Sequence, residues 1–326
     1  MKTLLRFALA TAFALAATLA ASAADMPSAP RKKILVFTKS SGFQHDAIRT
    51  ENQPGRGYGF RVLHALAAKN NLELTLSKDG SPFSPEYLAQ FDGFIFYTTG
   101  DLTQTNSDGR GDNMPPMSPA GKAALLQAIA DGKGFVGIHS ASDSFHSFGR
   151  NTHVPQRFDD DGDAADDYIK MLGGEFIRHG AQQKTRVIVA DAKFPGVEAI
   201  PGDWAPQEEW YSLKNFARDM HVILVQETAG MTGVEYQRPP YPSTWIRPHG
   251  KGRVFYTSLG HREDIWDHPA FQAVLTGGIN WTIGRFETDV TPNLAKAAPG
   301  AHVLPKYVAP ASPAPKKAEP AKAEKK

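Results

Sequence analysis

Histidine and carboxylate side chains stand directly after several short apolar runs of the chain. His45 and Asp46 follow the first run, Asp101 follows the third, His139 ends the fourth, and His261 follows a later one. An imidazole beside a carboxylate can move a proton next to a carbonyl group or at a glycosidic bond. Three imidazoles and a carboxylate are also adequate ligands for a divalent metal such as zinc. These residue types predict acid–base chemistry, with a divalent metal as the candidate cofactor.

The candidates fall into two groups by side-chain chemistry, proton-transferring groups and groups that could hold a sugar ring. We assign as candidate catalytic residues His45, Asp46, Asp101, His139, Glu209 and His261. We assign as candidate substrate-binding residues Phe43, Ser140, Trp210, Tyr211 and Trp245. His45, His139 and His261 are also the candidate metal ligands. Each group has a structural alternative, because carboxylates cap turns and aromatic rings pack cores. His179 stays undecided between a site and a structural role.

The elements that must position these residues alternate between strand and helix. Short apolar runs predict strands at 33–38, 72–76, 93–97 and 134–138. Apolar spacing and the caps Ser84 and Ser118 predict helices at 58–69, 85–90 and 119–131. This alternation is typical of an α/β fold with a mainly parallel sheet. Ligands bind outside the carboxyl ends of such strands, so the candidate residues are expected to share one rim.

The second half of the body predicts an antiparallel extension of that sheet. Strands are indicated at 186–190, 222–226, 243–246 and 253–257, and the turn at 248–252 favours a hairpin. A helix at 269–283 closes the body. No linker interrupts it, so we expect one domain from residue 31 to 287.

Both ends of the chain differ in composition from the body. Residues 1–24 have basic residues, an apolar run too short to span a bilayer, and a small-residue cleavage site, which predicts a signal peptide and export, to the periplasm or as a secreted protein. Residues 297–326 are rich in Pro, Ala and Lys and predict a disordered tail. The tail is expected to be solvated, with contact to an anionic envelope surface as the alternative. No later run approaches membrane length, so no stable membrane insertion is expected.

Composition excludes several classes of protein. The net charge of +2 arises at the two ends and leaves the body mildly acidic, so no nucleic-acid partner is expected. The absence of cysteine excludes disulfides and thiol catalysis. No phosphate-binding or dinucleotide fingerprint follows a strand, so no nucleotide cofactor is expected. The acidic run 159–163 has Ala164 and Lys170 where a calcium loop needs Gly and Glu, and it predicts a solvated loop.

Five segments, in order over residues 33–284, resemble the ThuA-like (trehalose utilisation) family. They include Gly42-Phe43-Gln44-His45-Asp46, Tyr97-Thr98-Thr99-Gly100-Asp101, Gly137-Ile138-His139-Ser140-Ala141-Ser142-Asp143, Glu208-Glu209-Trp210-Tyr211 and Gly260-His261. The resemblance implies a flavodoxin-like variant, the class I glutamine amidotransferase-like sandwich, and a link to carbohydrate metabolism. A longer acidic insertion at 148–167 departs from the family's pattern.

The resemblance also bears on His139. Glutamine amidotransferases present a cysteine at the end of the corresponding strand, whereas this chain reads Gly137-Ile138-His139. A glutaminase with a cysteinyl intermediate is therefore excluded. The Gly-x-Ser-x-Gly pattern of serine hydrolases is not met either. An imidazole at this elbow can bind a metal or transfer protons.

Two functions remain open at this point. The first is an enzyme, of hydrolase, lyase or isomerase type, acting on a small-molecule carbohydrate or oxidised sugar derivative. The second is a non-catalytic carbohydrate-binding or envelope protein that keeps only a pocket. We favour the enzyme, because a pocket alone needs neither several histidines nor carboxylates at its rim.

Overall fold

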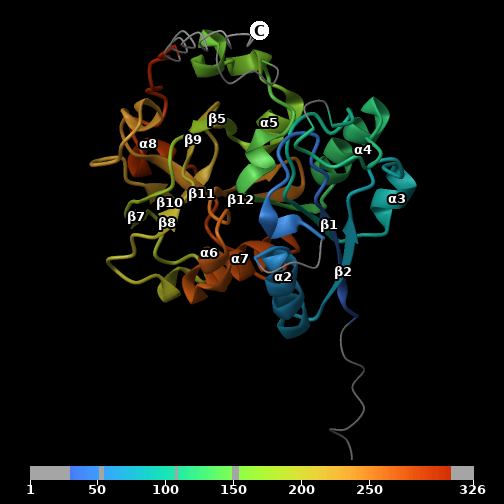
Figure 1. Cartoon of the computed structure of the whole chain (residues 1–326). Coiled ribbons are helices and arrows are strands. Elements are labelled where there is room, and N and C mark those ends of the chain that lie inside the picture. Colours follow the sequence, from blue (N-terminus) through green and yellow to red (C-terminus); the bar gives the residue numbers. More distant parts are fainter. Residues whose placement is uncertain (1–29, 51–54, 107–108, 149–153, 310–326) are drawn as a thin grey trace, which may run out of the picture. The chain divides into compact units, whose positions relative to one another are not determined.

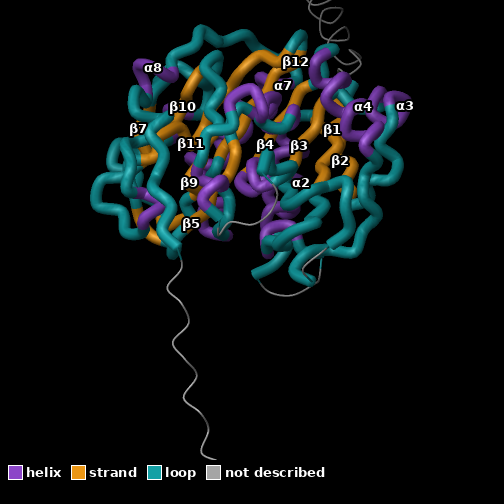
Figure 2. Tube along the Cα trace, turned by 90° about the horizontal axis from the view of Figure 1, so that it is seen from above, coloured by secondary structure: helices purple, strands orange, loops and turns teal. Residues whose placement is uncertain are grey.

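The computed structural model describes residues 30–50, 55–106, 109–148 and 154–309. Its frame is an eight-stranded sheet in the order β2-β1-β3-β4-β12-β11-β10-β7. Neighbours from β2 to β12 pair in parallel, and the pairs from β12 to β7 are antiparallel. Figure 2 shows these strands side by side across the view. The mainly parallel α/β sheet with an antiparallel extension, predicted from sequence, is confirmed.

The strands of this sheet lie close to their predicted positions. They are β1 (Lys32–Phe37), β2 (Leu72–Ser77), β3 (Gly93–Phe96), β4 (Gly134–Ile138), β7 (Val187–Val189), β10 (His221–Gln226), β11 (Tyr241–His249) and β12 (Gly252–Thr257). The helices are α2 (Tyr58–Lys69), α3 (Pro85–Ala89), α4 (Pro119–Ala130), α5 (Asp167–Leu172), α6 (Glu263–Asp267), α7 (Pro269–Thr282) and α8 (Leu294–Ala297).

Side-chain alternation along each central strand feeds two separate cores. In β1, Ile34 and Val36 join one apolar cluster, and Leu35 and Phe37 join the other. Because successive strand residues point to opposite faces, one run of apolar residues serves both. Helices α2, α6 and α7 contribute to the first cluster, and α4 and α5 to the second. Figure 1 shows α2, α6 and α7 grouped together, apart from α3, α4 and α5.

Local signals in the sequence set the helix ends. The Ser84 and Ser118 hydroxyls accept hydrogen bonds from the backbone N–H groups of Tyr87 and Gly121, which caps α3 and α4. Helix α5 ends at Gly173, whose φ of 89° is a left-handed conformation that glycine adopts without steric cost. The sequence predicted the two serine caps.

Two small antiparallel sheets were not predicted. One pairs β5 (Glu175–His179) with β9 (Tyr211–Lys214), and the other pairs β6 (Gln183–Lys184) with β8 (Gln207–Glu208). Residues 209 and 210 connect β8 to β9. The two small sheets therefore bring the segment that carries Glu208 and Glu209 to the main sheet.

The predicted disordered tail begins later than residue 297. Ala298 and Ala301 are buried, and the Arg238 guanidinium donates to the Ala301 carbonyl oxygen. The side chain of Asn293 pairs with the backbone of Val222 in β10 through both its amide nitrogen and its oxygen. The composition of this segment predicted disorder, but its small alanine side chains pack against the body. The body therefore also extends past the predicted end at 287.

The remaining part of that tail, residues 310–326, lies outside the described residues, as does the predicted signal peptide, residues 1–24. Within the described ranges, none of the helices has the length and apolar character needed to cross a bilayer.

Candidate functional site

The carboxyl ends of β1, β3, β4 and β12 meet at one rim of the main sheet. The segments that follow them are tied together by backbone pairing of Ser40 with Thr99 and of Gly100 with Ser144. The Ser41 N–H also donates to the Thr99 carbonyl oxygen at 2.9 Å. The loops after neighbouring strands are therefore held in fixed positions, as ligand-binding loops in parallel sheets require.

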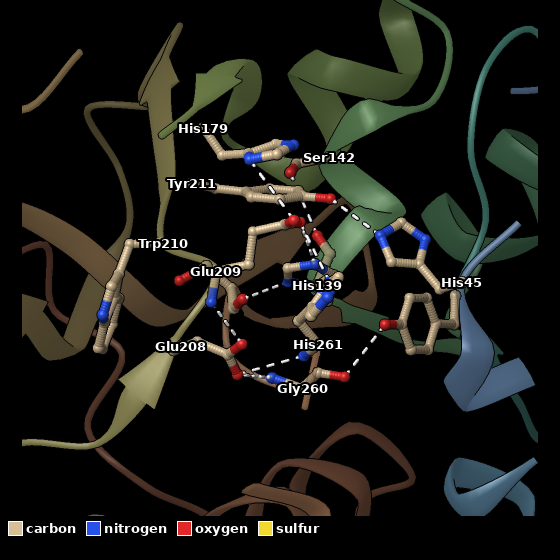
Figure 3. Close-up of polar contacts among 12 residues, drawn as sticks. His45, His139, Ser142, His179, Glu208, Glu209, Trp210, Tyr211, Gly260 and His261 are labelled. Atoms are coloured by element: carbon tan, nitrogen blue, oxygen red, sulfur yellow. Dashed lines mark hydrogen bonds and ion pairs between the residues drawn. The ribbon is translucent and has the colours of Figure 1, made fainter. Parts of the chain in front are cut away.

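Three histidines and one glutamate converge at this rim. One potential ligand atom from each of His45, His139, Glu209 and His261 lies within 4.8 Å of those of the other three. The imidazole rings of His45, His139 and His261 have centroids 5.1 to 5.3 Å apart. Figure 3 shows the four side chains pointing toward one another from separate segments.

His139 occupies a sharp turn directly after β4. Its φ is 45°, an uncommon value for a residue with a side chain. Two residues earlier, a Cβ at Gly137 would lie only 2.9 Å from the Leu172 side chain, so the strand needs glycine there. The His139 Nδ1 lies 2.7 Å from the Ser258 carbonyl oxygen. Because a carbonyl only accepts, Nδ1 donates to it, and Nε2 is directed at the cluster.

His45 is a buried member of the group, 3% exposed. Burial lowers the pKa of His45 well below its ordinary value, and the neighbouring His139 and His261 lower it further. A ring held neutral offers a lone pair, which is the form that binds metal ions. Its Nε2 lies 3.4 Å from the Tyr211 hydroxyl, while its Nδ1 has no hydrogen-bond partner.

Glu209 is the anion of the cluster. Its Oε2 lies 3.1 Å from His261 Nδ1 and 3.5 Å from His139 Nε2. Burial alone raises the pKa of Glu209, but hydrogen bonds and charge from these two histidines outweigh it and lower that pKa well below the usual range. Burial lowers the pKa of His261, but Glu209 reverses this, so the net pKa is raised. The Glu209 anion and the neighbouring histidines therefore stabilise one another's charged forms.

The residues present fit a divalent metal ion. The buried His45 Nδ1 has no hydrogen-bond partner, and the buried His139 Nε2 and His261 Nδ1 face the same Glu209 oxygen at 3.5 and 3.1 Å. Buried polar atoms in proteins are normally partnered, so three imidazole nitrogens gathered around one carboxylate, one of them unpartnered, indicate a missing ligand. Metal bonds of about 2.1 Å would place neighbouring ligand atoms about 3 to 4 Å apart, which small inward movements of this set would reach.

Solvent reaches the group from the side of His179 and His261. The His179 side chain is 42% exposed, and its Nδ1 lies 3.5 Å from Glu209 Oε1. Its ring is stacked over Tyr211 with an interplanar angle of 16°. On another side, His261 lines a surface pocket of about 570 Å³ together with Phe43 and Asp46. A small molecule can therefore approach the cluster.

The chain matches a known family over most of its length. The profile of the ThuA family, described as trehalose utilisation, matches residues 33–282. The chain belongs to the ThuA family. None of the curated proteins matches it.

Two solved structures are similar to this chain over most of its length. A putative ThuA-like protein from Bacteroides uniformis ATCC 8492 is 19% identical and superimposes with a TM-score of 0.55, over 82% of this chain and 98% of that one. A putative ThuA-like protein from Parabacteroides merdae ATCC 43184 is 16% identical, with a TM-score of 0.47, over 85% of this chain and 98% of that one. At such identities the first likeness shows the shared fold.

The predicted site residues of this ThuA-family chain separate into two sets. The structure brings together His45, His139, Glu209, His261 and Tyr211, whose ring centroid lies 4.1 Å from that of His139. Phe43 stands at the edge, 44% exposed and with its ring edge-on to His45.

Three polar candidates lie outside the cluster. Asp46 is exposed and forms an ion pair with Arg49. Asp101 caps a turn by accepting hydrogen bonds from the Thr103 N–H and hydroxyl, and it lines a different pocket. Ser140 is buried next to His139, and its hydroxyl has no partner.

Two tryptophans predicted to bind sugar are core residues instead, which corrects that assignment. Trp245 is fully buried, donates to the Leu172 carbonyl oxygen and packs on Tyr256. Trp210 is also fully buried and donates to the Gln183 carbonyl oxygen. Figure 3 shows Trp210 pointing away from the histidines. Neither ring has a free face to stack on a ligand.

Sequence analysis missed Glu208 as a contributor and left His179 undecided. A period-two alternation through Glu208-Glu209-Trp210-Tyr211 would have separated Glu209 and Tyr211 from Glu208 and Trp210, because residues two apart lie on the same face of an extended chain. Glu209 and Tyr211 face the histidines, and Trp210 faces the core. β8 and β9 are too short to show a recognisable strand pattern in the sequence, so this alternation was not predicted.

Proposed function

We propose that this ThuA-family chain is an enzyme that binds one divalent transition-metal ion and acts on a sugar or an oxidised sugar derivative. The ligands are His45, His139, Glu209 and His261. The observation that carries the proposal is the convergence of three buried imidazole nitrogens, that of His45 without a hydrogen-bond partner, on the partly buried carboxylate of Glu209. The family description, trehalose utilisation, supports a carbohydrate as the substrate class.

The donor set suits a divalent transition-metal ion. Three imidazole nitrogens and a carboxylate are ligands for zinc, iron, nickel and related ions. Held by these four side chains, the ion would supply a Lewis acid to a sugar oxygen that approaches the cluster.

An ion bound in this way acts as a Lewis acid. The ion would polarise a substrate carbonyl. The proton on the neighbouring carbon would pass to the exposed imidazole of His179, which would return it to the other carbon in an isomerisation or to the leaving group in an elimination. His179 is placed to contact the substrate, since it is exposed and adjoins Glu209. The phenol of Tyr211 lies on the same side of the cluster.

The test is turnover by metal-reconstituted protein on glycosides and on their 3-keto derivatives. We expect turnover that is lost in apoprotein and falls by about 10²-fold or more in His139→Asn. Asparagine is chosen because it tolerates the positive φ at this position better than alanine. Sugar binding without metal and without turnover, retained in His139→Asn, would instead support the non-catalytic carbohydrate-binding protein.

We also propose that the protein is exported. Support comes only from the basic, apolar and small-residue pattern of residues 1–24. Sequencing the mature protein from a periplasmic fraction is the test, with a new N-terminus after Ala23 or Ala24 expected. An intact Met1 in the recovered protein would overturn this.

A further inference from the structure

Glu208 is a buried carboxylate that directly precedes the candidate ligand Glu209. It is 0% exposed, and no lysine or arginine in the described part of the chain is paired with it. Burial raises the pKa of Glu208, although the nearby His139 and backbone N–H groups act in the opposite direction. Burying a carboxylate without a cationic partner is costly. The hydrogen bonds that Glu208 accepts offset this cost.

Both oxygens of Glu208 accept hydrogen bonds from backbone N–H groups. Oε1 accepts from the N–H of Glu209 at 2.7 Å. Oε2 accepts from the N–H of Gly260 at 2.9 Å and from the N–H of His261 at 3.2 Å. One side chain therefore fixes the backbone at two residues of the cluster, Glu209 and His261 (Figure 3).

The turn that carries His261 is held from its other side as well. The Gly260 carbonyl oxygen accepts hydrogen bonds from the Tyr97 hydroxyl at 3.0 Å and from Trp266 Nε1 at 2.6 Å. The Tyr58 hydroxyl donates to the His261 carbonyl oxygen. Gly260 has a φ of 118°, which favours glycine. With the carbonyls held by these donors, Glu208 is the group that takes the two N–H donors of the turn.

Only a carboxylate can accept at both ends. Glutamine has the same length, but one of its ends is an NH₂ group that donates. In Glu208→Gln that group would face an N–H donor, either at Glu209 or at the Gly260–His261 turn. One of the two ligand-bearing segments would then lose its anchor, while side-chain volume stays almost unchanged.

We propose that Glu208 is a positioning residue that sets the metal affinity and geometry of the site by fixing Glu209 and His261 relative to each other, without touching the ion. This inference rests on the proposed metal site. Groups that orient ligands in this way typically change metal affinity by about 10- to 100-fold when they are altered.

The test compares the binding of zinc and cobalt(II) by Glu208→Gln and by the unaltered protein. Zinc affinity is measured by competition with a chelator, and geometry by the visible absorption of bound cobalt(II). We expect Glu208→Gln to bind zinc about 10- to 100-fold more weakly and to show a changed cobalt(II) spectrum. An unchanged zinc Kd together with an unchanged spectrum overturns the inference.

Glu175→Gln is the matched control for loss of a buried carboxylate. Glu175 is also 0% exposed and also accepts several hydrogen bonds, but its partners are His146, Ser147 and Asn215. We expect this variant to lose stability and to keep the zinc Kd and the cobalt(II) spectrum. If it weakens zinc binding as much as Glu208→Gln does, the effect is general destabilisation and the inference fails.

Glu208→Asp covers the case in which Glu208→Gln does not fold. Aspartate keeps both acceptor oxygens and withdraws them by one methylene group, so the three N–H groups can no longer all be reached. We expect a zinc Kd raised severalfold and a shifted spectrum, and values equal to those of the unaltered protein overturn the inference. Absence of zinc binding in the unaltered protein defeats the proposed function itself, which separates the two failures.

Discussion

His139 Nε2 lies 3.5 Å from the carboxylate of Glu209, although one residue directly follows β4 and the other lies between β8 and β9. The contact joins the main parallel sheet to a small antiparallel one. It depends on the positive φ of His139, which turns the ring out of the strand direction. In the proposed metal site, these two atoms are two of the four ligands.

Zinc is expected to stabilise the folded protein. A ligand that binds only the native state at 100 times its Kd adds about 2.7 kcal/mol. For a domain of this size, at about 2.1 cal/mol/K of unfolding entropy per residue, that raises the Tm by roughly 5 °C. The measurement is thermal unfolding of apoprotein with and without zinc. His139→Asn is the control, and a Tm increase of the same size in that variant would show that zinc binds elsewhere.

Replacement of His179 is expected to separate chemistry from metal binding. The ring is 42% exposed and adjoins Glu209 but is not one of the four clustered donors. His179→Gln should therefore lower kcat/KM by about 10²-fold while the metal content stays unchanged. His64→Ala is a matched control, because His64 is an exposed histidine on α2. Full activity in His179→Gln would exclude a role for this ring in turnover.

Acid is expected to destabilise the fold through Glu175. Burial alone raises the pKa of Glu175, but His146, Lys214 and Ser147 outweigh it and lower that pKa to about 2. The charged groups facing this carboxylate are His146, Lys214 and Arg157.

A carboxylate whose pKa is depressed on folding stabilises the protein above its unfolded pKa, and this stability is lost as the pH falls toward the folded value. The window therefore runs from about pH 4.5 down to about pH 2, and the loss is of the order of 3 kcal/mol. Urea unfolding at pH 6, 4 and 3 measures it. Glu175→Gln should be less stable at pH 6 and show a shallower pH dependence, and parallel curves for both proteins would contradict the assignment.

Truncation tests where the body ends. A chain that stops after residue 287 loses the pairing of Asn293 with β10 and the buried Ala298 and Ala301. Each lost buried hydrogen bond exposes or orphans a partner at about 1–3 kcal/mol, so this chain should be several kcal/mol less stable. A chain that stops after residue 309 should match the full chain within about 0.5 kcal/mol. Equal denaturation midpoints for all three would restore the shorter boundary.

The sequence indicated the rim correctly because strand direction is a strong constraint. Apolar runs ending in His139 and in the Gly260–His261 turn belong to strands that pair in parallel, so their ends meet at one edge of the sheet. His45 follows β1 in the same way. The histidines could thus be expected to share a rim without any knowledge of their contacts.

Other features depend on packing that a single sequence does not specify. Glu208 and Glu209 are adjacent and of the same residue type. Which of them faces the histidines is determined by the pairing of β8 with β6 and of β9 with β5. Trp210 and Trp245 were assigned to a binding surface because aromatic rings suit sugars, but the antiparallel extension is covered on both faces and buries them. The alanines after residue 297 have little apolar area, and their burial depends on a complementary surface around Arg238.

Elemental analysis of protein purified without chelator tests whether the cluster of His45, His139, Glu209 and His261 binds a metal ion. The His139→Asn variant is prepared in parallel. The account predicts about one equivalent of a divalent transition metal per chain in the unaltered protein and almost none in the variant, at equal fold by circular dichroism. A metal-free unaltered protein that also takes up no zinc, cobalt or nickel on dialysis would contradict it, as would equal metal content in the two proteins.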